Sequence, residues 1–279
     1  MTTIGGFTEA QLPIKPFLKW AGGKRWLASL IQEMIPDIEG RYIEPFVGSG
    51  AIYFALTPRR ALLSDVNESL VEAFRCVRDY PDEVESLLVA HDSRHSQSHY
   101  YVTRAIEYAR RVERAAQFIY LNRTCWNGLY RVNKLGQFNV PIGTKTSARL
   151  ASDDWPGLSV ILSGAQLRCQ DFESTIDSAV KGDLVFADPP YTVKHNLNGF
   201  IKYNESLFSW DDQVRLRDSL VRAKQRGVKI IVTNADHESV RKLYADDFNL
   251  KTLERFSVLS GDPAYRGKFN EILITANQE

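Results

Sequence analysis

Short apolar runs alternate with segments of helical periodicity along most of the chain. The runs suited to buried strands span residues 42–43, 61–64, 166–169, 184–186, 229–233 and 271–275. A segment with the 3.6-residue period of an amphipathic helix, residues 211–221, lies between two of them. Strands that alternate with helices predict an α/β fold built on a doubly wound sheet.

One long interval, residues 68–163, departs from this alternation. Residues 69–90 and 97–121 carry apolar positions at helical spacing. The turn signals Asn127-Gly128, Leu135-Gly136 and Pro141-Ile142-Gly143 follow. We therefore expect a mainly helical subdomain over residues 68–163, inserted into a sheet domain formed by residues 1–67 and 164–279.

Composition narrows the class of protein. The chain has 279 residues, of which 25% are charged and 44% hydrophobic, and this is typical of a soluble globular protein. No apolar stretch approaches the roughly 20 residues of a membrane span, and the N-terminus has no signal-peptide pattern. Cys76, Cys125 and Cys169 are scattered and lack histidines at ligand spacing, so we expect neither disulfides nor a metal site. These observations favour a cytoplasmic protein without a membrane partner, and we expect a monomer in solution.

The distribution of charge is more informative than its sum of +1. Between Glu113 and Asp153 the chain has no acidic residue. Six cations fall in this stretch, namely Arg114, Arg123, Arg131, Lys134, Lys145 and Arg149, and aromatic residues that include Tyr120, Trp126, Tyr130 and Phe138 lie among them. Local positive charge interleaved with aromatic rings indicates a nucleic-acid surface.

A four-residue motif, Asp188-Pro189-Pro190-Tyr191, follows the apolar run at 184–186. It lies at the carboxyl end of an expected strand, where open α/β sheets bind their ligands. The Asp188 carboxylate and the Pro189 carbonyl could accept both N–H groups of an exocyclic amine on a nucleobase. Tyr191 offers a flat face for a base that has left the helix. The motif therefore indicates methylation of an exocyclic amine, with Asp188, Pro189 and Tyr191 as catalytic residues.

A glycine turn and an acidic residue predict a nucleoside cofactor. Gly48 and Gly50 follow the first expected strand and precede a helical segment, and Asp65 ends the next strand. An acid in that place characteristically bonds ribose hydroxyls. Tyr53 replaces the third glycine of the NAD fingerprint, which disfavours a nicotinamide dehydrogenase.

The N-terminal motif that ends in Gly22-Gly23-Lys24 does not form a nucleotide-triphosphate loop. Such a loop needs a glycine six residues before its lysine and Ser or Thr after it, and this chain has Leu18 and Arg25 there. Lys24 is better interpreted as a cation for a carboxylate or phosphate.

Taken in order, the motifs resemble those of the Dam-type DNA adenine methyltransferases. The segments that carry this resemblance are Phe17 to Lys24, Glu44 to Gly50, Ser64 to Asn67, Leu121 to Arg123, Trp126 to Gly143, and Asp188 to Tyr191. They span roughly residues 15 to 275 in the order of the family. The resemblance implies a Rossmann-like sheet that binds S-adenosylmethionine, an inserted DNA-recognition subdomain, and double-stranded DNA as the partner.

The resemblance also implies roles for individual residues. S-adenosylmethionine would contact Trp20, Lys24, Asp65 and Asp188. The loop that contains Gly48 would also bind it, and Phe46, Asp171 and Phe172 would lie near its adenine. The DNA-binding residues would include Lys19, Leu129, Arg131 and Pro141 at base edges, Trp126 and Asn127 beside the flipped base, and the basic residues Arg123 and Lys145.

The family's usual target is adenine in GATC, and two departures bear on this detail. Trp126 stands where relatives more often have Tyr or Phe, and Thr144 where a basic residue is common. Methylation of cytosine at N4 needs the same amine chemistry and stays open, as does a catalytically silent DNA-binding regulator. An RNA adenine methyltransferase is a further alternative, but this sequence contains no visible RNA-binding module. Methylation of cytosine at C5 needs a cysteine nucleophile, which the motif does not contain.

Overall fold

The structure is a computed structural model that describes residues 14–20, 23–35, 37–133, 135–193, 208–256 and 268–278. Lys134 and the Ala21-Gly22 pair of the N-terminal motif lie outside the described residues. The chain divides into two compact units. We call Met1–Ala28, Ser49–Thr57 and Glu72–Ser163 the helical unit, and Ser29–Gly48, Pro58–Val71 and Gly164–Glu279 the sheet unit. None of the described helices is long and apolar enough to cross a membrane.

The sheet unit contains a seven-stranded sheet in the order β3-β2-β1-β4-β5-β7-β6. Its strands are β1 (Tyr42–Glu44), β2 (Ala61–Asp65), β3 (Ala165–Cys169), β4 (Leu184–Ala187), β5 (Lys229–Ala235), β6 (Asn249–Phe256) and β7 (Lys268–Ala276). The first five are parallel, while β7 is antiparallel to β5 and β6. The predicted α/β class is confirmed, and six of the seven strands coincide with the apolar runs.

Two features of this sheet place the ligand-binding edge. The chain leaves β1 toward β2 and β3 on one side and returns to β4 on the other, so the order reverses between β1 and β4. Open α/β sheets bind ligands beyond the carboxyl ends of the strands at such a point. The residues that follow β1 and β4, Pro45-Phe46 and Asp188-Pro189, therefore lie at the expected place.

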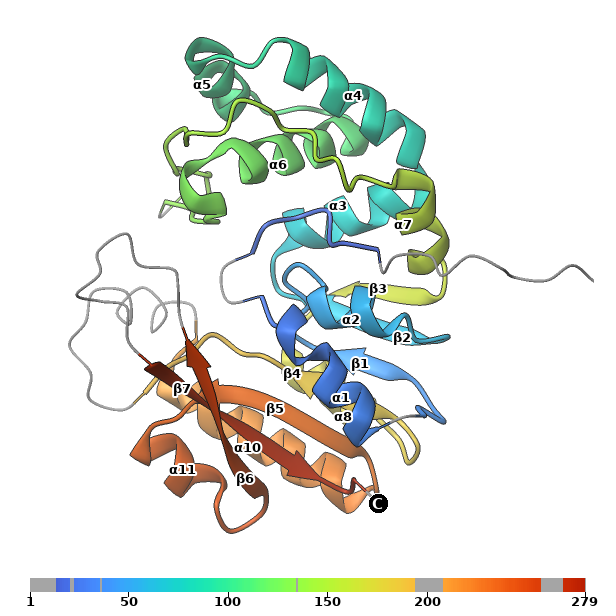
Figure 1. Ribbon diagram of the computed structural model, residues 1–279, viewed down its shortest axis with the longest axis vertical. Coiled ribbons are helices and arrows are strands. Elements are labelled where there is room, and N and C mark those ends of the chain that lie inside the picture. Colours follow the sequence, from blue (N-terminus) through green and yellow to red (C-terminus); the bar gives the residue numbers. More distant parts are fainter. Residues whose placement is uncertain are drawn as a thin grey trace, which may run out of the picture. The chain divides into compact units, whose positions relative to one another are not determined.

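The core of the sheet unit lies between one face of the sheet and three helices, which are α8 (Phe172–Asp177), α10 (Trp210–Gln225) and α11 (Glu238–Tyr244). Ile230, Val232 and Ile274 face these helices. Two-residue spacing on β5 and β7 therefore directs Thr233 and Glu271 to the opposite face. Helix α1 (Ala28–Met34) also lies mainly in this unit, and the short η1 turn (Arg25–Leu27) precedes it. Figure 1 shows β5, β6, β7 and α10 in the orange and red part of the chain.

The helical unit is formed mainly by α4 (Pro81–Ser93), α5 (Gln97–Ala105), α6 (Arg111–Thr124) and α7 (Trp155–Leu162), with α2 (Ala51–Leu56) and most of α3 (Glu68–Asp79). Helix α4 packs against α6 and α7. The edge of the Phe17 ring meets the ring of Phe74 at a centroid distance of 4.8 Å. In Figure 1 this unit carries the green elements α4, α5 and α6.

Both long helical intervals of the sequence are broken in the structure. The interval 69–90 divides at Tyr80, because Pro81 starts α4 at a position where its missing N–H is tolerated. The interval 97–121 divides after Ala105, and side chains of α6 satisfy the backbone there. Gln117 donates to the carbonyls of Thr103 and Ile106 at 2.6 and 2.8 Å.

Candidate functional site

The catalytic motif predicted from the sequence begins directly after β4. Asp188 is partly exposed, and Pro189 behind it is buried. The Asp188 Oδ1 atom accepts a hydrogen bond from the Thr233 hydroxyl on the neighbouring strand β5 at 2.7 Å. The carboxylate is therefore held at the carboxyl end of β4, and the bond from β5 fixes the plane in which its two oxygens lie.

Tyr191, three residues further, is bonded to a third strand. Its hydroxyl donates to Glu271 Oε2 on β7 at 3.1 Å, and the Glu271 side chain is buried. Burial raises the pKa of Tyr191 well above its ordinary value, and the negative charges of Asp188 and Glu271 act in the same direction. The phenol therefore stays protonated at physiological pH and serves as a hydrogen-bond donor rather than as a base.

Asp65 ends β2 and is bonded to the glycine turn after β1. Gly48 has a φ of 48°, a left-handed conformation that favours glycine. Its N–H donates to Asp65 Oδ2 at 3.3 Å, and the Asn67 N–H donates to Oδ1 at 3.0 Å. Burial raises the pKa of Asp65, while these backbone hydrogen bonds oppose that shift. Each carboxylate oxygen has two lone pairs, so the group retains acceptor capacity for ligand hydroxyls.

An aromatic wall stands beside these groups. The rings of Phe46 and Phe172 stack at a centroid distance of 5.3 Å. Asp171 caps α8 through the Glu173 N–H and forms an ion pair with Arg215 at 2.8 Å. The Arg215 guanidinium also lies over the Phe172 ring, 4.9 Å from its centroid. The sequence predicted Phe46, Asp171 and Phe172 at one place, and the structure brings them together there.

These residues fit an adenosine-type methyl donor. Residues Asp171, Asp65, Phe46 and Asp188 follow or end β3, β2, β1 and β4, which are consecutive in the sheet. They thus extend along one edge over three strand spacings, roughly 14 Å. Carboxylates, a backbone N–H turn and an apolar wall suit the hydroxyls, cationic part and base of an elongated nucleoside. Among the described residues, no group of three His, Cys, Asp or Glu side chains could hold a metal ion.

In the helical unit, Lys19 is fixed to α6 by two reciprocal hydrogen bonds. The Lys19 N–H donates to Asn122 Oδ1, and Asn122 Nδ2 donates back to the Lys19 carbonyl, both at 2.8 Å. Its ammonium group donates to the Arg123 carbonyl at 3.4 Å. Burial lowers the pKa of Lys19, and the nearby cations Lys145 and Arg123 lower it further. The backbone of Lys19 is thus rigid, and its charge lies among other positive groups.

A pocket of about 230 Å³ adjoins Lys19. Its lining residues are Lys19, Cys125, Trp126, Asn127, Gly128, Thr144 and Lys145. Trp126 is 51% exposed, so a large apolar surface is in contact with water at this pocket. Asn127 and Gly128 both have left-handed backbone angles, with φ of 54° and 65°. An added Cβ on Gly128 would lie 2.8 Å from the Lys19 Cβ, so glycine permits the close approach of this turn.

The stretch from Cys125 to Lys145, which we call the reading segment, turns back on itself. Cys125 forms an isolated bridge with Ile142, and Val132 forms another with Phe138. The Trp126 N–H donates to the Pro141 carbonyl at 2.9 Å. Arg131 is exposed and donates to Asn139 Oδ1 at 2.7 Å, while Leu129 is partly exposed and Pro141 is exposed. The segment therefore displays the residues that the sequence assigned to DNA.

Arg123 is a correction to the sequence analysis. The side chain is fully buried. It forms a bidentate ion pair with Asp153, with both N–O distances at 2.7 Å, and donates to the carbonyls of Phe17 and Ala148. These four hydrogen bonds lie within the helical unit and the side chain is buried, so Arg123 is structural and not a direct contact to phosphate. Arg114, another cation of the basic stretch, is paired with Glu72.

The structure places the two remaining predicted residues in the helical unit. The indole of Trp20 stacks on Tyr130 of the reading segment, with ring centroids 5.6 Å apart. Lys24 is buried and immediately precedes the η1 turn. Their assignment to the methyl donor stays a prediction.

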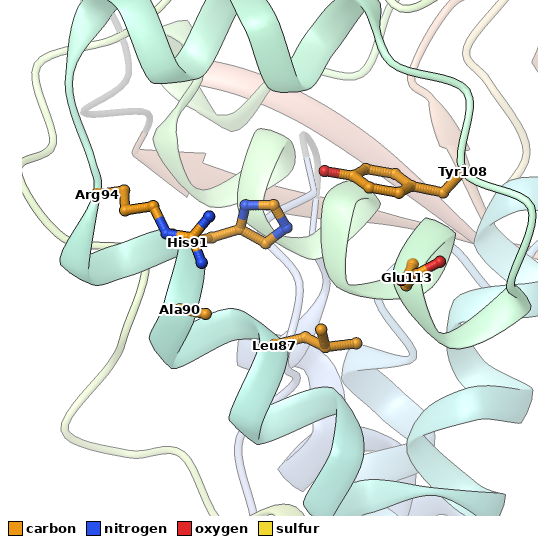
Figure 2. A pocket seen from close by; sticks show the side chains of 6 residues that line it. All are labelled: Leu87, Ala90, His91, Arg94, Tyr108 and Glu113. Atoms are coloured by element: carbon orange, nitrogen blue, oxygen red, sulfur yellow. The ribbon is translucent and has the colours of Figure 1, made fainter.

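A second pocket in the helical unit, of about 180 Å³, contains none of the predicted site residues. His91 of α4 and Tyr108 before α6 point toward it (Figure 2). His91 bonds to His99 at 3.1 Å and stacks on Tyr120. Burial lowers the pKa of His91 to about 4, so the ring is neutral at neutral pH. These contacts give the imidazole a packing role.

Three residues next to the predicted site were missed by the sequence analysis, namely Thr233, Glu271 and Arg215. Thr233 and Glu271 lie in strands that were recognised as apolar runs. A carboxylate within such a run was the available signal, because a buried acid needs a hydrogen-bond partner. Arg215 had no such signal, because Glu173 and Asp171, its partners next to the site, lie 42 and 44 residues away in the sequence.

Comparisons with known proteins show the family to which the chain is similar. The family model described as D12 class N6 adenine-specific DNA methyltransferase matches residues 20–259. A type II methyltransferase of Lactococcus lactis subsp. cremoris, M1.LlaDCHI, is 34% identical over 95% of this chain and 96% of its own length. M.MjaIII of Methanocaldococcus jannaschii is 35% identical over 94% and 99%. A DNA adenine methylase of Haemophilus influenzae is 30% identical over 95% and 94%.

Proposed function

The chain belongs to the D12 class of N6 adenine-specific DNA methyltransferases, and we propose that it uses S-adenosylmethionine to methylate adenine within GATC in double-stranded DNA. It is an enzyme that modifies DNA, as the family and the relatives' names state. Because the family is N6 adenine-specific, membership in it favours adenine methylation over the two alternatives, a cytosine-N4 methyltransferase and a catalytically silent DNA-binding regulator. The identity of the cofactor, the residues that hold it and the recognised sequence are the parts that we propose.

The cofactor is assigned to the edge of the sheet that carries Asp65 and Phe46. S-adenosylmethionine, when bound, supplies an electrophilic methyl group on a positively charged sulfur. The Asp65 carboxylate would accept hydrogen bonds from the ribose hydroxyls. Phe46 and Phe172, already stacked on each other, would form the apolar wall for the adenine ring. The glycine turn at Gly48 lets the ligand approach the backbone closely.

The target amine is activated by the catalytic motif. The lone pair of an exocyclic amine is delocalised into the ring, so the nitrogen is a poor nucleophile. Asp188 and the carbonyl of Pro189 would each accept one N–H, which draws the nitrogen toward a tetrahedral geometry. As the new N–C bond formed, the methyl–sulfur bond would break, the neutral thioether S-adenosylhomocysteine would leave, and the positive charge would pass from sulfur to this nitrogen. The Asp188 carboxylate stabilises that charge, and the proton leaves afterwards.

Tyr191 supplies a face for the adenine that has left the double helix. Stacking of a base on an aromatic side chain contributes about 1–3 kcal/mol. In the structure the phenol is fixed by Glu271, so the ring orientation exists before a base arrives. A prepared surface of this kind reduces the entropy lost when the base is captured.

The position of Asp188-Pro189-Pro190-Tyr191 is the observation that carries the proposal. The motif lies at the carboxyl end of β4, where the strand order reverses next to β1, and Asp65 ends β2 on the other side of β1. Recognition is assigned to Lys19 and to Leu129, Arg131 and Pro141 of the reading segment. The division into a catalytic domain (1–67 and 164–279) and a DNA-recognition subdomain (68–163) stays a prediction, as does the monomer.

Methylation of short duplexes with labelled S-adenosylmethionine tests the proposal. The substrates are a duplex with one GATC site and every single-base variant of it. We expect the highest kcat/KM on GATC and N6-methyladenine as the product. Equal rates on all duplexes would overturn the proposed sequence, while label on cytosine N4, or binding without methylation, would restore one of the alternatives.

A further inference from the structure

Two residues that lie outside the catalytic motif form hydrogen bonds with its functional side chains, one with Asp188 and the other with Tyr191. Thr233 on β5 donates to Asp188 at 2.7 Å, and Glu271 on β7 accepts from Tyr191 at 3.1 Å. Thr233 is fully buried and Glu271 is 7% exposed. Neither residue is near the motif in the sequence, since the first pair is separated by 45 residues and the second by 80.

The sheet register explains why these two side chains are together. Strands β5 and β7 are antiparallel neighbours, in which Thr233 pairs with Leu273 and Ala235 pairs with Glu271. Thr233 and Glu271 are therefore diagonal neighbours, and both side chains lie on the face opposite the core helices. The antiparallel strand β7 thus places Glu271 beside Thr233 and within hydrogen-bond distance of Tyr191.

A buried glutamate is costly unless it is bonded, so packing alone does not account for Glu271. Its bond to the phenol ties down the far end of the Tyr191 ring, while the Cα end is held by the rigid Pro189-Pro190 turn. On Asp188, the bond at Oδ1 fixes the direction in which Oδ2 points, because the carboxylate is planar. Each functional side chain of the motif is therefore oriented by a partner from the paired strands.

We propose that Glu271 and Thr233 are positioning residues for methyl transfer: Glu271 fixes the Tyr191 ring as the platform for the flipped base, and Thr233 orients the Asp188 carboxylate toward the amine. This inference rests on the proposed function of the motif. Neither residue contacts the reacting atoms, so their effect on the reaction passes through Tyr191 and Asp188.

A double-mutant cycle tests the role of Glu271. The variants are Glu271→Gln, Tyr191→Phe and the double variant, and Thr275→Val is the matched control because it removes another buried hydroxyl from β7. The control site is four residues away along the strand, roughly 13 Å. Two quantities are measured, the single-turnover methylation rate and the fluorescence of 2-aminopurine placed at the target adenine.

We expect Glu271→Gln and Tyr191→Phe each to lower the rate by about tenfold or more, the factor that corresponds to a hydrogen bond with a charged group. The double variant should be no slower than Tyr191→Phe, since that substitution already removes the hydrogen bond to Glu271. The change in 2-aminopurine fluorescence on binding should differ from that of wild type in all three variants. The methylation rate and fluorescence of Thr275→Val, and the DNA affinity of every variant, should stay within about twofold of wild type. Multiplicative effects, or unchanged 2-aminopurine fluorescence, would overturn the role of Glu271.

Thr233 is tested by a pair of substitutions. Thr233→Val keeps the shape and removes the hydroxyl, whereas Thr233→Ser keeps the hydroxyl. We expect the valine variant to lower kcat by about tenfold with little change in KM, and the serine variant to restore most of it. Equal losses in both variants would show a packing role and overturn the assignment. If the wild-type protein methylates no adenine, the proposed function fails, and not the positioning roles alone. If Glu271→Gln does not fold, Tyr191→Phe still tests the Glu271 role, because it removes the same hydrogen bond from the other side.

Discussion

The carboxyl edge of the sheet and the reading segment hold their functional residues in different ways. At the sheet edge, Asp188 and Tyr191 follow a buried strand, and neighbouring strands bond both side chains. In the reading segment, Trp126 and Arg131 project from irregular backbone that is tied by two isolated bridges. Under the proposed function, the chemistry therefore rests on side chains that neighbouring strands hold, whereas recognition uses exposed side chains on irregular backbone.

Arg123 and Arg131 show the same contrast at the level of single residues. Both belong to the acid-free stretch, and both were predicted to bind DNA. Arg123 is fully buried against Asp153, while Arg131 is exposed beside Asn139.

Replacement of Arg123 by alanine should destabilise the protein most. It leaves Asp153 without its bidentate partner in a mostly buried place. Loss of one partner of a buried ion pair typically costs about 3–5 kcal/mol in the free energy of unfolding. Urea denaturation measures this, with Arg131→Ala as the exposed control, which should stay within about 0.5 kcal/mol of wild type. A stable Arg123→Ala protein with weakened DNA binding would return Arg123 to the DNA contacts.

Replacement of Asp188 by alanine should abolish most methyl transfer and leave fold and DNA affinity largely intact. Removal of one preorganised electrostatic group typically lowers kcat by about 10²–10³-fold. Single-turnover rates with labelled cofactor measure the loss, and Asp211→Ala on the exposed start of α10 is the control. Near wild-type turnover in Asp188→Ala would remove the carboxylate from the mechanism.

Replacement of Asp65 by alanine should weaken S-adenosylmethionine binding by about 1.5–3 kcal/mol, the range for hydrogen bonds to a charged group. Titration calorimetry measures the affinity. The ionised carboxylate is the better acceptor, so affinity should fall as pH decreases through the raised pKa of Asp65. Asp65→Asn should show a weak and nearly pH-independent affinity. An unchanged affinity in Asp65→Ala would place the cofactor elsewhere.

Two exposed cations separate base reading from phosphate binding. Arg131→Ala should cost about 1–3 kcal/mol on the cognate site and relax discrimination at one position. Lys145→Ala should weaken binding to every sequence alike and reduce the salt slope by about one. Binding across the GATC variants at several salt concentrations distinguishes them. If Arg131→Ala lowers affinity equally on all variants, Arg131 contacts phosphate and another residue of the reading segment reads the base.

The sequence predicted the parts of the fold that local patterns determine. Buried parallel strands are short apolar runs, so β1 to β5 were visible, and the polar edge strand β6 was missed because edge strands carry charge. The sheet-edge residues could be predicted because each follows its own strand and the strand ends meet. The partners Thr233 and Glu271 depend on the order and register of β4, β5 and β7, which no local pattern determines. Arg123 failed for the same reason, since Asp153 lies 30 residues away.

The identity of the methylated base decides whether this enzyme methylates adenine through Asp188. Duplex DNA with one GATC site is incubated with S-adenosylmethionine and either wild type or Asp188→Ala, and the digested nucleosides are separated by mass spectrometry. The account predicts N6-methyladenine from wild type and a loss of at least about 10²-fold with Asp188→Ala. N4-methylcytosine, or an undiminished yield of N6-methyladenine with Asp188→Ala, would contradict it.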